Sequence, residues 1–172
     1  MQHDQMLIND NIHVLEQGME LIERLDDRLY TRVNRPFSTH GIGSHFRHCI
    51  DFYHSFLTAV GTGKINYDDR VRDEWVESRR LFATSKLRAM IEGLQRLSLT
   101  DNQGEVQVIL EGSSWSRSSV KRELQFLLSH TIHHYALIAL ALRLQGFDPG
   151  EEFGVAPSTL EYWRQSARGV QT

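Results

Sequence analysis

Two groups of histidines have the residue types and spacing for metal chemistry. One is His45-Phe46-Arg47-His48, and the other is His130-Thr131-Ile132-His133-His134. Each lies in a segment with helical patterning, and an α-helix turns about 100° per residue, so His130 and His134 point in similar directions one turn apart. A third imidazole from the other segment would complete a three-nitrogen face. Such a face suits Zn²⁺ or Ni²⁺ and leaves coordination positions open for water and substrate.

The spacing of the histidines leaves several ligand combinations open. His130 with His134 is the tighter pair, and His130 with His133 is the alternative. His133 and His134 lie about 100° apart on a helix, so one ion does not suit both. In the other segment, His45 and His48 share a broad face because they lie about 60° apart. Either of them is a candidate third ligand.

Apolar residues at helical spacing predict the elements that position these histidines. Four long helices are expected, over residues of about 4–32, 39–60, 74–98 and 120–145. A capping-box sequence at residues 158–161 predicts a short fifth helix that ends near residue 167. Residues 106–110 are β-branched and apolar, so a short strand is expected there, with a small hairpin to residues 114–118. Residues 64–73 form a charged connection that is too long for a tight turn.

Local signals mark the ends of the fourth helix. Ser119 precedes this helix as a candidate N-cap, and Gly146 follows it as a stop signal. Modest loops between four long helices predict an all-α fold. The expected architecture is an up-down four-helix bundle with a short β-prone insert before the fourth helix and a short C-terminal helix. Residues 1–172 are expected to form one domain.

Composition and charge exclude several classes of function. The chain has 172 residues, of which 40% are hydrophobic and 24% charged, as is ordinary for a soluble globular protein. Its net charge of −3 offers no electrostatic footprint for nucleic acid, and no segment approaches the length of a membrane span. The single cysteine, Cys49, precludes an intramolecular disulfide and fits a cytoplasmic location. We interpret it as a buried core thiol, with a redox-sensitive neighbour of the metal as the alternative.

With these residues in view, the chain resembles the DinB-like superfamily over most of its length. The most telling string is Glu-Leu-Gln-Phe-Leu-Leu-Ser-His-Thr-Ile-His-His at residues 123–134. The string Gly-Ile-Gly-Ser-His-Phe-Arg-His at residues 41–48 is similar to the family's entry to its first ligand. Carried over to this sequence, the resemblance implies a metal-ligand triad and two substitutes, namely His48, His130 and His134 as ligands, with His45 and His133 as alternatives.

The resemblance also implies an activity. Members of the superfamily bind a divalent metal, often Zn²⁺ or Ni²⁺, and several resemble thiol-dependent S-transferases or hydrolases. The expected function is therefore that of a metal-dependent enzyme. Its three-histidine site would activate water or a low-molecular-weight thiol for hydrolysis or S-transfer on a small molecule. A non-catalytic metal-binding or interaction domain that keeps the fold is the alternative.

Glu123 is the acid that the helical spacing places closest to this chemistry. It precedes His130 by two turns on nearly the same face, so we predict that it lies near the metal and acts as a general acid–base catalyst. Further candidates for a part in the chemistry are Arg47, Tyr135 and residues 67–70.

Two more expectations concern assembly and pH. A homodimer is expected through residues 106–110 or through an exposed helix face. Ligand imidazoles must be neutral to bind a metal ion. Metal affinity is therefore expected to fall below about pH 6.5, the unperturbed pKa of histidine.

Overall fold

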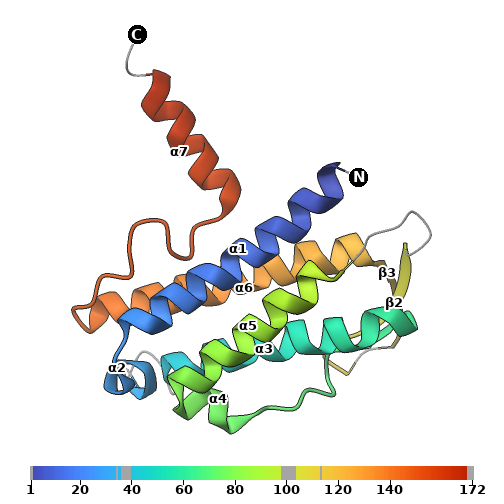
Figure 1. The fold of residues 1–172 in the computed structure, drawn as a ribbon, viewed down its shortest axis with the longest axis horizontal. Coiled ribbons are helices and arrows are strands. Elements are labelled where there is room, and N and C mark those ends of the chain that lie inside the picture. Colours follow the sequence, from blue (N-terminus) through green and yellow to red (C-terminus); the bar gives the residue numbers. More distant parts are fainter. Residues whose placement is uncertain (1, 34, 36–39, 98–103, 113, 170–172) are drawn as a thin grey trace.

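A computed structural model of the chain describes residues 2–33, 35, 40–97, 104–112 and 114–169. Four long helices dominate it: α1 (Gln2–Arg24), α3 (Ile42–Ala59), α5 (Arg80–Gln95) and α6 (Val120–Leu144). α1 packs against α5 and α6, and α3 packs against the same two helices (Figure 1). Buried apolar side chains from all four fill the space between them, among them Leu15, Phe46, Leu87 and Leu127.

The helices do not simply alternate in direction. Figure 1 shows that α3 and α5 run the same way, opposite to α1 and α6. The connection between α3 and α5 contains η1 (Val60–Thr62), β1 (Lys64–Asn66) and α4 (Glu74–Ser78). It leaves one end of the molecule and returns to the other before α5 begins. The predicted up-down order is therefore wrong for α5, because a long crossover lets consecutive helices run parallel.

A three-stranded sheet lies at the end where α6 begins. Its middle strand β2 (Glu105–Ile109) pairs in parallel with β1 and antiparallel with β3 (Ser116–Ser119). The two later strands agree with the predicted strand and hairpin. The strand at residues 64–66 corrects the all-α expectation, which placed these residues in a charged loop. Ile65 is its one buried residue, and three residues are too few to show an alternating pattern.

Two of the predicted helices are each divided by a local break. The first ends at Arg24 and resumes as α2 (Asp27–Thr31), because the Asp26 side chain accepts a hydrogen bond from the backbone N–H of Leu29 at 2.7 Å. The third is divided into α4 and α5 at Arg79, whose backbone is extended. Residues 39 and 98, the expected start of the second helix and end of the third, lie outside the described residues.

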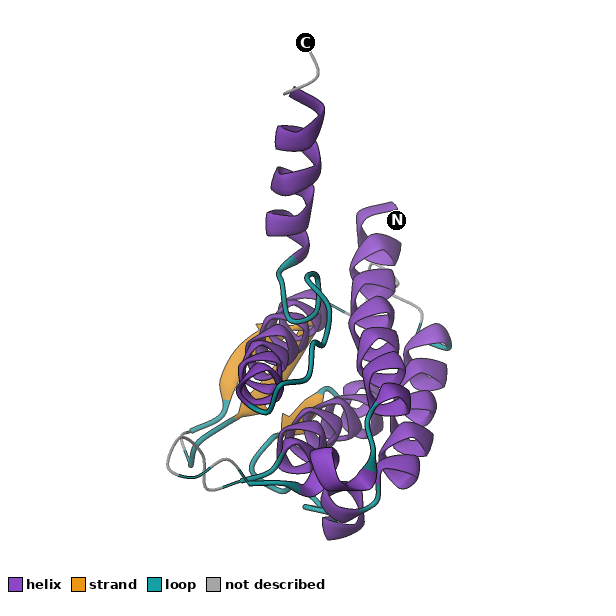
Figure 2. Cartoon of the chain, turned by 90° about the vertical axis from the view of Figure 1, so that its left-hand side faces the viewer, coloured by secondary structure: helices purple, strands orange, loops and turns teal. Residues whose placement is uncertain are grey.

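The fourth helix begins and ends close to the predicted positions. The Ser119 hydroxyl accepts a hydrogen bond from the backbone N–H of Arg122, which confirms the N-cap. Gly146 follows the helix with φ of 78°, a left-handed conformation that favours glycine. The last helix, α7 (Pro157–Gly169), projects away from the other helices (Figure 2). None of the helices in the described segments combines the length and apolar character that a membrane crossing requires.

Candidate metal centre

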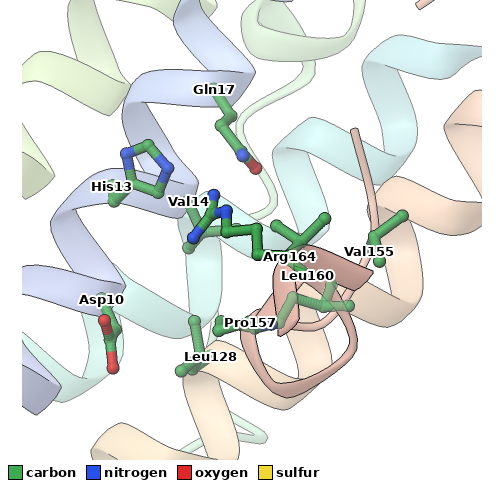
Figure 3. Close-up of a pocket in the computed structure, with 10 residues that line it drawn as sticks. Asp10, His13, Val14, Gln17, Leu128, Val155, Pro157, Leu160 and Arg164 are labelled. Atoms are coloured by element: carbon green, nitrogen blue, oxygen red, sulfur yellow. The ribbon is translucent and has the colours of Figure 1, made fainter. Parts of the chain in front are cut away.

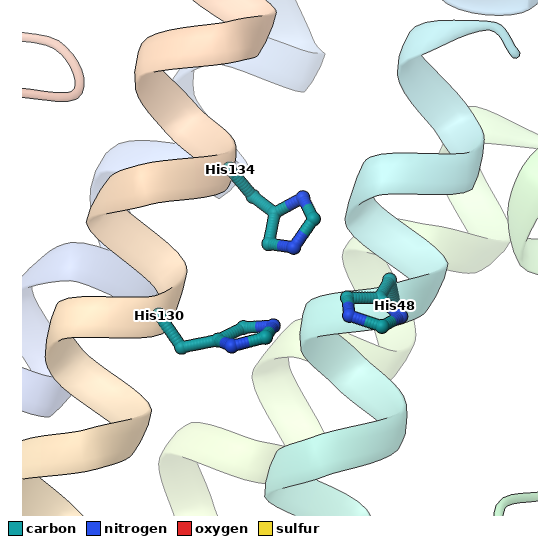
Figure 4. A group of neighbouring side chains, drawn as sticks. All are labelled: His48, His130 and His134. Carbon is teal, nitrogen blue, oxygen red and sulfur yellow. The ribbon is translucent and has the colours of Figure 1, made fainter. Parts of the chain in front are cut away.

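Three histidines converge where α3 faces α6. His48 lies on α3, and His130 and His134 lie one turn apart on α6. Figure 4 shows their side chains pointing into the same space between the two helices. Each ring offers a nitrogen, and these three atoms all lie within 4.8 Å of one another. The ring centroids are 4.6 Å apart for His48 and His134, 4.7 Å for His130 and His134, and 5.0 Å for His48 and His130.

Core packing sets the rotation of both helices. Cys49 and Tyr53 of α3 and Thr131 and Tyr135 of α6 are all buried, so the neighbouring histidine positions fall at the seam between the helices. Burial raises the pKa of the Cys49 thiol to about 12. A protonated, fully buried thiol agrees with the core interpretation of this cysteine.

The three imidazoles are half-buried and neutral near pH 7. Burial is the largest cause that lowers the pKa of His48 and His130 to about 4 and that of His134 to about 3. Neighbouring histidines lower all three further. Neutral imidazole is the form that binds a metal ion. Nε2 of His130 is buried and has no hydrogen-bond partner within the described part of the chain, so it is a polar atom that a cation would satisfy.

Two further histidines stand beside this group. Nδ1 of His45 lies 3.0 Å from Nδ1 of His134, so the two rings hold one another in place. His133 is exposed and meets the ring of His134 edge-on, with centroids 5.4 Å apart. Among the described residues, neither of them belongs to the group whose ligand atoms lie close to one another. The geometry therefore favours His48 over His45, and His134 over His133.

An aromatic layer closes one side of the histidine group. Phe52 lies one turn after His48, and its ring is 4.5 Å from that of His130. Phe126 lies one turn before His130, at 5.3 Å. Tyr67, which directly follows β1, stacks on Phe52 at 5.1 Å. Our sequence reasoning missed both phenylalanines, although each lies four residues from a candidate ligand and so shares its helix face.

Glu123 lies beyond this aromatic layer. It is 4% exposed, and its carboxylate accepts hydrogen bonds from the hydroxyls of Tyr67, at 2.9 Å, and Ser118. Seven residues of helix separate it from His130, a rise of roughly 10 Å. Its catalytic role stays a prediction. The contacts that the structure does show are to the side chain of Tyr67 and to the strand before α6.

The opposite face of α6 lines a separate cavity of about 150 Å³ (Figure 3). Leu128 and Ile132 of α6 form part of its wall, together with residues of α1 and of the C-terminal segment. His13 and Arg164 contribute polar atoms. Within the described residues, one group of three candidate metal ligands is present, and it does not line this cavity.

Comparison with known proteins gives a partial match in sequence and a broad match in structure. No protein-family model matches the chain. It is 34% identical over 109 residues to FK506-binding protein 5 of Rhizopus delemar, a match that covers 57% of this chain and 27% of that protein's length. The crystal structure of a DinB-like protein, YjoA, from Bacillus subtilis is similar with a TM-score of 0.62 and 16% identity. That likeness covers 86% of this chain and 94% of the other. The chain therefore has a DinB-like fold, as the resemblance in its sequence predicts.

Proposed function

We propose that this chain binds one divalent metal ion through His48, His130 and His134. The site would activate water or a low-molecular-weight thiol for hydrolysis or S-transfer on a small molecule. The observation that carries the proposal is the convergence of three neutral imidazoles from two facing helices, with ligand atoms within 4.8 Å of one another. Three protein nitrogens leave room for further ligands, which is typical of catalytic rather than structural sites. Zn²⁺ and Ni²⁺ are the expected ions because imidazole suits both.

The surrounding residues have separate tasks in this proposal. A divalent cation supplies Lewis acidity that lowers the pKa of a water molecule or a thiol. His45 orients the ring of His134 through the contact between their Nδ1 atoms. Phe52 and Phe126 exclude water from one side of the site, which strengthens electrostatic interactions inside it.

Metal content and turnover together test the proposal. Elemental analysis of protein loaded with Zn²⁺ or Ni²⁺ should give about one ion per chain. The loaded protein is then screened with several low-molecular-weight thiols and electrophiles, and with water as the only nucleophile. Turnover that disappears in His130→Ala would support catalysis at this site. Full metal stoichiometry in that variant would contradict the ligand assignment.

A non-catalytic metal site is the second candidate function, and the position of His45 is the observation that favours it. With His45 as a fourth ligand the shell would be closed, as in structural sites. His45→Ala separates the two functions. Loss of the metal ion from this variant would indicate a closed four-histidine shell. Retention of the ion would indicate an open site in which His45 only orients His134.

We also propose that the chain forms a homodimer through helix faces. We choose a helix face over the strand at residues 106–110, because β2 is the middle strand of the sheet and has a neighbour on each side. α7 is a helix of 13 residues whose positions 161–168 are exposed, and so short a helix is marginal alone. Exposed apolar side chains lie on it and on the outer face of α6, namely Leu137, Leu140, Leu144, Tyr162 and Trp163.

A further inference from the structure

The guanidinium of Arg70 lies beside the histidine group. Its Cζ atom is 4.6 Å from the centroid of the Phe52 ring. That ring is in turn 4.5 Å from His130 and 4.9 Å from His48. The positive charge and two of the imidazoles therefore contact the same aromatic ring. In agreement with this placement, the Arg70 charge adds to burial in lowering the pKa of both His48 and His130.

This guanidinium has no anionic partner within the described part of the chain. Its Nε atom is buried and makes no hydrogen bond there. The two nearest acids are engaged elsewhere. Asp51 pairs with Arg47 at 3.3 Å, and the Asp68 carboxylate accepts hydrogen bonds from backbone N–H groups of the turn after β2. Buried polar groups are rarely left unbonded, so the free Nε donor indicates an anion that is supplied from outside the chain.

Arg47, at the same site, differs from Arg70 because it is paired with acids of the chain. It lies on α3 next to His48, and its Nε donates to Glu77 at 2.7 Å while its terminal nitrogen bonds Asp51. Its charge is thus balanced by two carboxylates from the chain itself. The contrast leaves Arg70 as the arginine of this site that is available to a ligand.

The segment that carries Arg70 is anchored immediately before it. The backbone N–H of Tyr67 donates to the carbonyl of Ile109 at 3.0 Å, and the Tyr67 hydroxyl donates to Glu123. The Asp68 carboxylate bonds the turn after β2. A segment held this firmly has less conformational entropy to lose when the arginine that it carries binds a ligand. The Glu123 carboxylate thus holds the Tyr67 hydroxyl three residues before Arg70.

We propose that Arg70 binds an anionic group, a carboxylate, sulfonate or phosphate, of the small molecule that reacts at the histidine group. This inference rests on the proposed metal site and narrows its substrate class to small molecules that carry an anionic group near the reacting atom. The planar guanidinium donates to such groups through paired, charge-assisted hydrogen bonds. The Phe52 ring, which contacts both Arg70 and the imidazoles, offers an apolar surface for the atoms that link the two ends of such a molecule.

Two thiols that differ in their anionic group test the proposal on cobalt-loaded protein. The probes are 2-mercaptoethanesulfonate and 2-mercaptoethanol, and binding is followed by the thiolate-to-cobalt absorption band. We expect the sulfonate to bind at least about tenfold more tightly, because its hydrogen bonds to the guanidinium join two charged groups. Arg70→Met should remove this preference and leave cobalt content and 2-mercaptoethanol affinity unchanged. Arg72→Met, which removes an exposed charge from the same segment, is the matched control and should keep the preference.

A second measurement needs no thiol. Phenylglyoxal modifies accessible arginines, and mass spectrometry measures the rates at Arg70 and Arg72 separately. Inorganic phosphate or methanesulfonate should slow the reaction at Arg70 severalfold and leave Arg72 unaffected. Equal protection of both residues, or a sulfonate preference that survives in Arg70→Met, overturns the inference and leaves the metal site intact. If neither thiol reaches the cobalt, the thiol part of the proposed function fails, and the protection experiment alone decides the role of Arg70.

Discussion

The two faces of α6 border two different spaces. The face with His130 and His134 meets α3, where three imidazoles converge. The face with Leu128 and Ile132 meets α1 and the C-terminal segment, where it lines a cavity of about 150 Å³ (Figure 3). Residues two positions apart on a helix lie about 200° apart, so a single helix serves both spaces.

The comparison shows that convergence of ligands, and not empty volume, marks the candidate site. The cavity is lined by His13, Asp10 and Arg164, but these side chains form no group of candidate metal ligands. Arg164 instead approaches Glu152 at 4.0 Å, an exposed contact that contributes little. At the other face the apolar Phe52 and Phe126 shield the histidines, and the pKa values of His48, His130 and His134 are lowered.

The largest expected difference between the two faces is in metal binding. His134→Ala should reduce the metal content from about one ion per chain to near zero, because two imidazoles hold an ion much more weakly than three. His13→Ala, which removes a histidine from the cavity, should leave the metal content unchanged. Elemental analysis after dialysis against metal-free buffer measures both. Equal metal loss in the two variants would remove the distinction between the faces.

The pH dependence of stability should report on the histidines between α3 and α6. In the unfolded chain the imidazoles have pKa values near 6.5, whereas in the folded protein those of His48 and His130 are about 4. Between these values the unfolded state binds more protons, so the free energy of unfolding of the metal-free protein should fall as the pH drops from about 6.5 to about 4. Above about pH 6.5 both states are neutral and this contribution is constant.

Urea denaturation at a series of pH values measures this slope. His48→Gln should flatten it, because this variant removes one of the imidazoles whose pKa is lowered. The lowered pKa values also revise the expected pH range of metal affinity. Protons should compete for the ligands nearer pH 4 than the pH of about 6.5 expected from unperturbed histidine. Metal affinity that already declines between about pH 7 and pH 6 would contradict the lowered values.

Substitutions at Glu123 and Tyr67 should have a smaller effect, on stability more than on metal content. Glu123→Gln and Tyr67→Phe each disrupt the buried hydrogen bond between the two side chains. Each should lower the free energy of unfolding by about 1–3 kcal/mol, the usual cost of an unsatisfied buried polar group. Thermal or urea denaturation of the metal-loaded variants provides the measurement. A hundredfold loss of turnover in Glu123→Gln with unchanged stability and metal content would instead support the acid–base role expected from helical spacing.

The smallest expected effect concerns the outer surface of α6 and α7. Combined replacement of Tyr162 and Trp163 by Ala should raise the dissociation constant of the proposed homodimer about tenfold or more, because exposed aromatics often dominate interfaces. Metal content should not change. Sedimentation velocity over a range of concentrations provides the measurement. A wild-type chain that is monomeric at every concentration would refute the dimer.

The sequence by itself determined features that depend on helical geometry and local hydrogen bonds. His130 and His134 share a face because they lie four residues apart, and Ser119 and Gly146 mark the ends of their helix through capping and a left-handed residue. The break at Asp26 has the same local origin and was accessible in principle. These features need no information about the rest of the chain.

Only the tertiary structure decided what each helix face meets. The spacing alone left His45 and His48 as equal candidates, and the choice depended on how the buried residues of α3 rotate that helix against α6. Helical arithmetic also placed Glu123 on the face of His130. The structure adds a hydrogen bond between residues 56 positions apart, which ties Glu123 to Tyr67, next to the segment that carries Arg70. Such contacts depend on packing between distant segments, which the periodicity of a single helix does not encode.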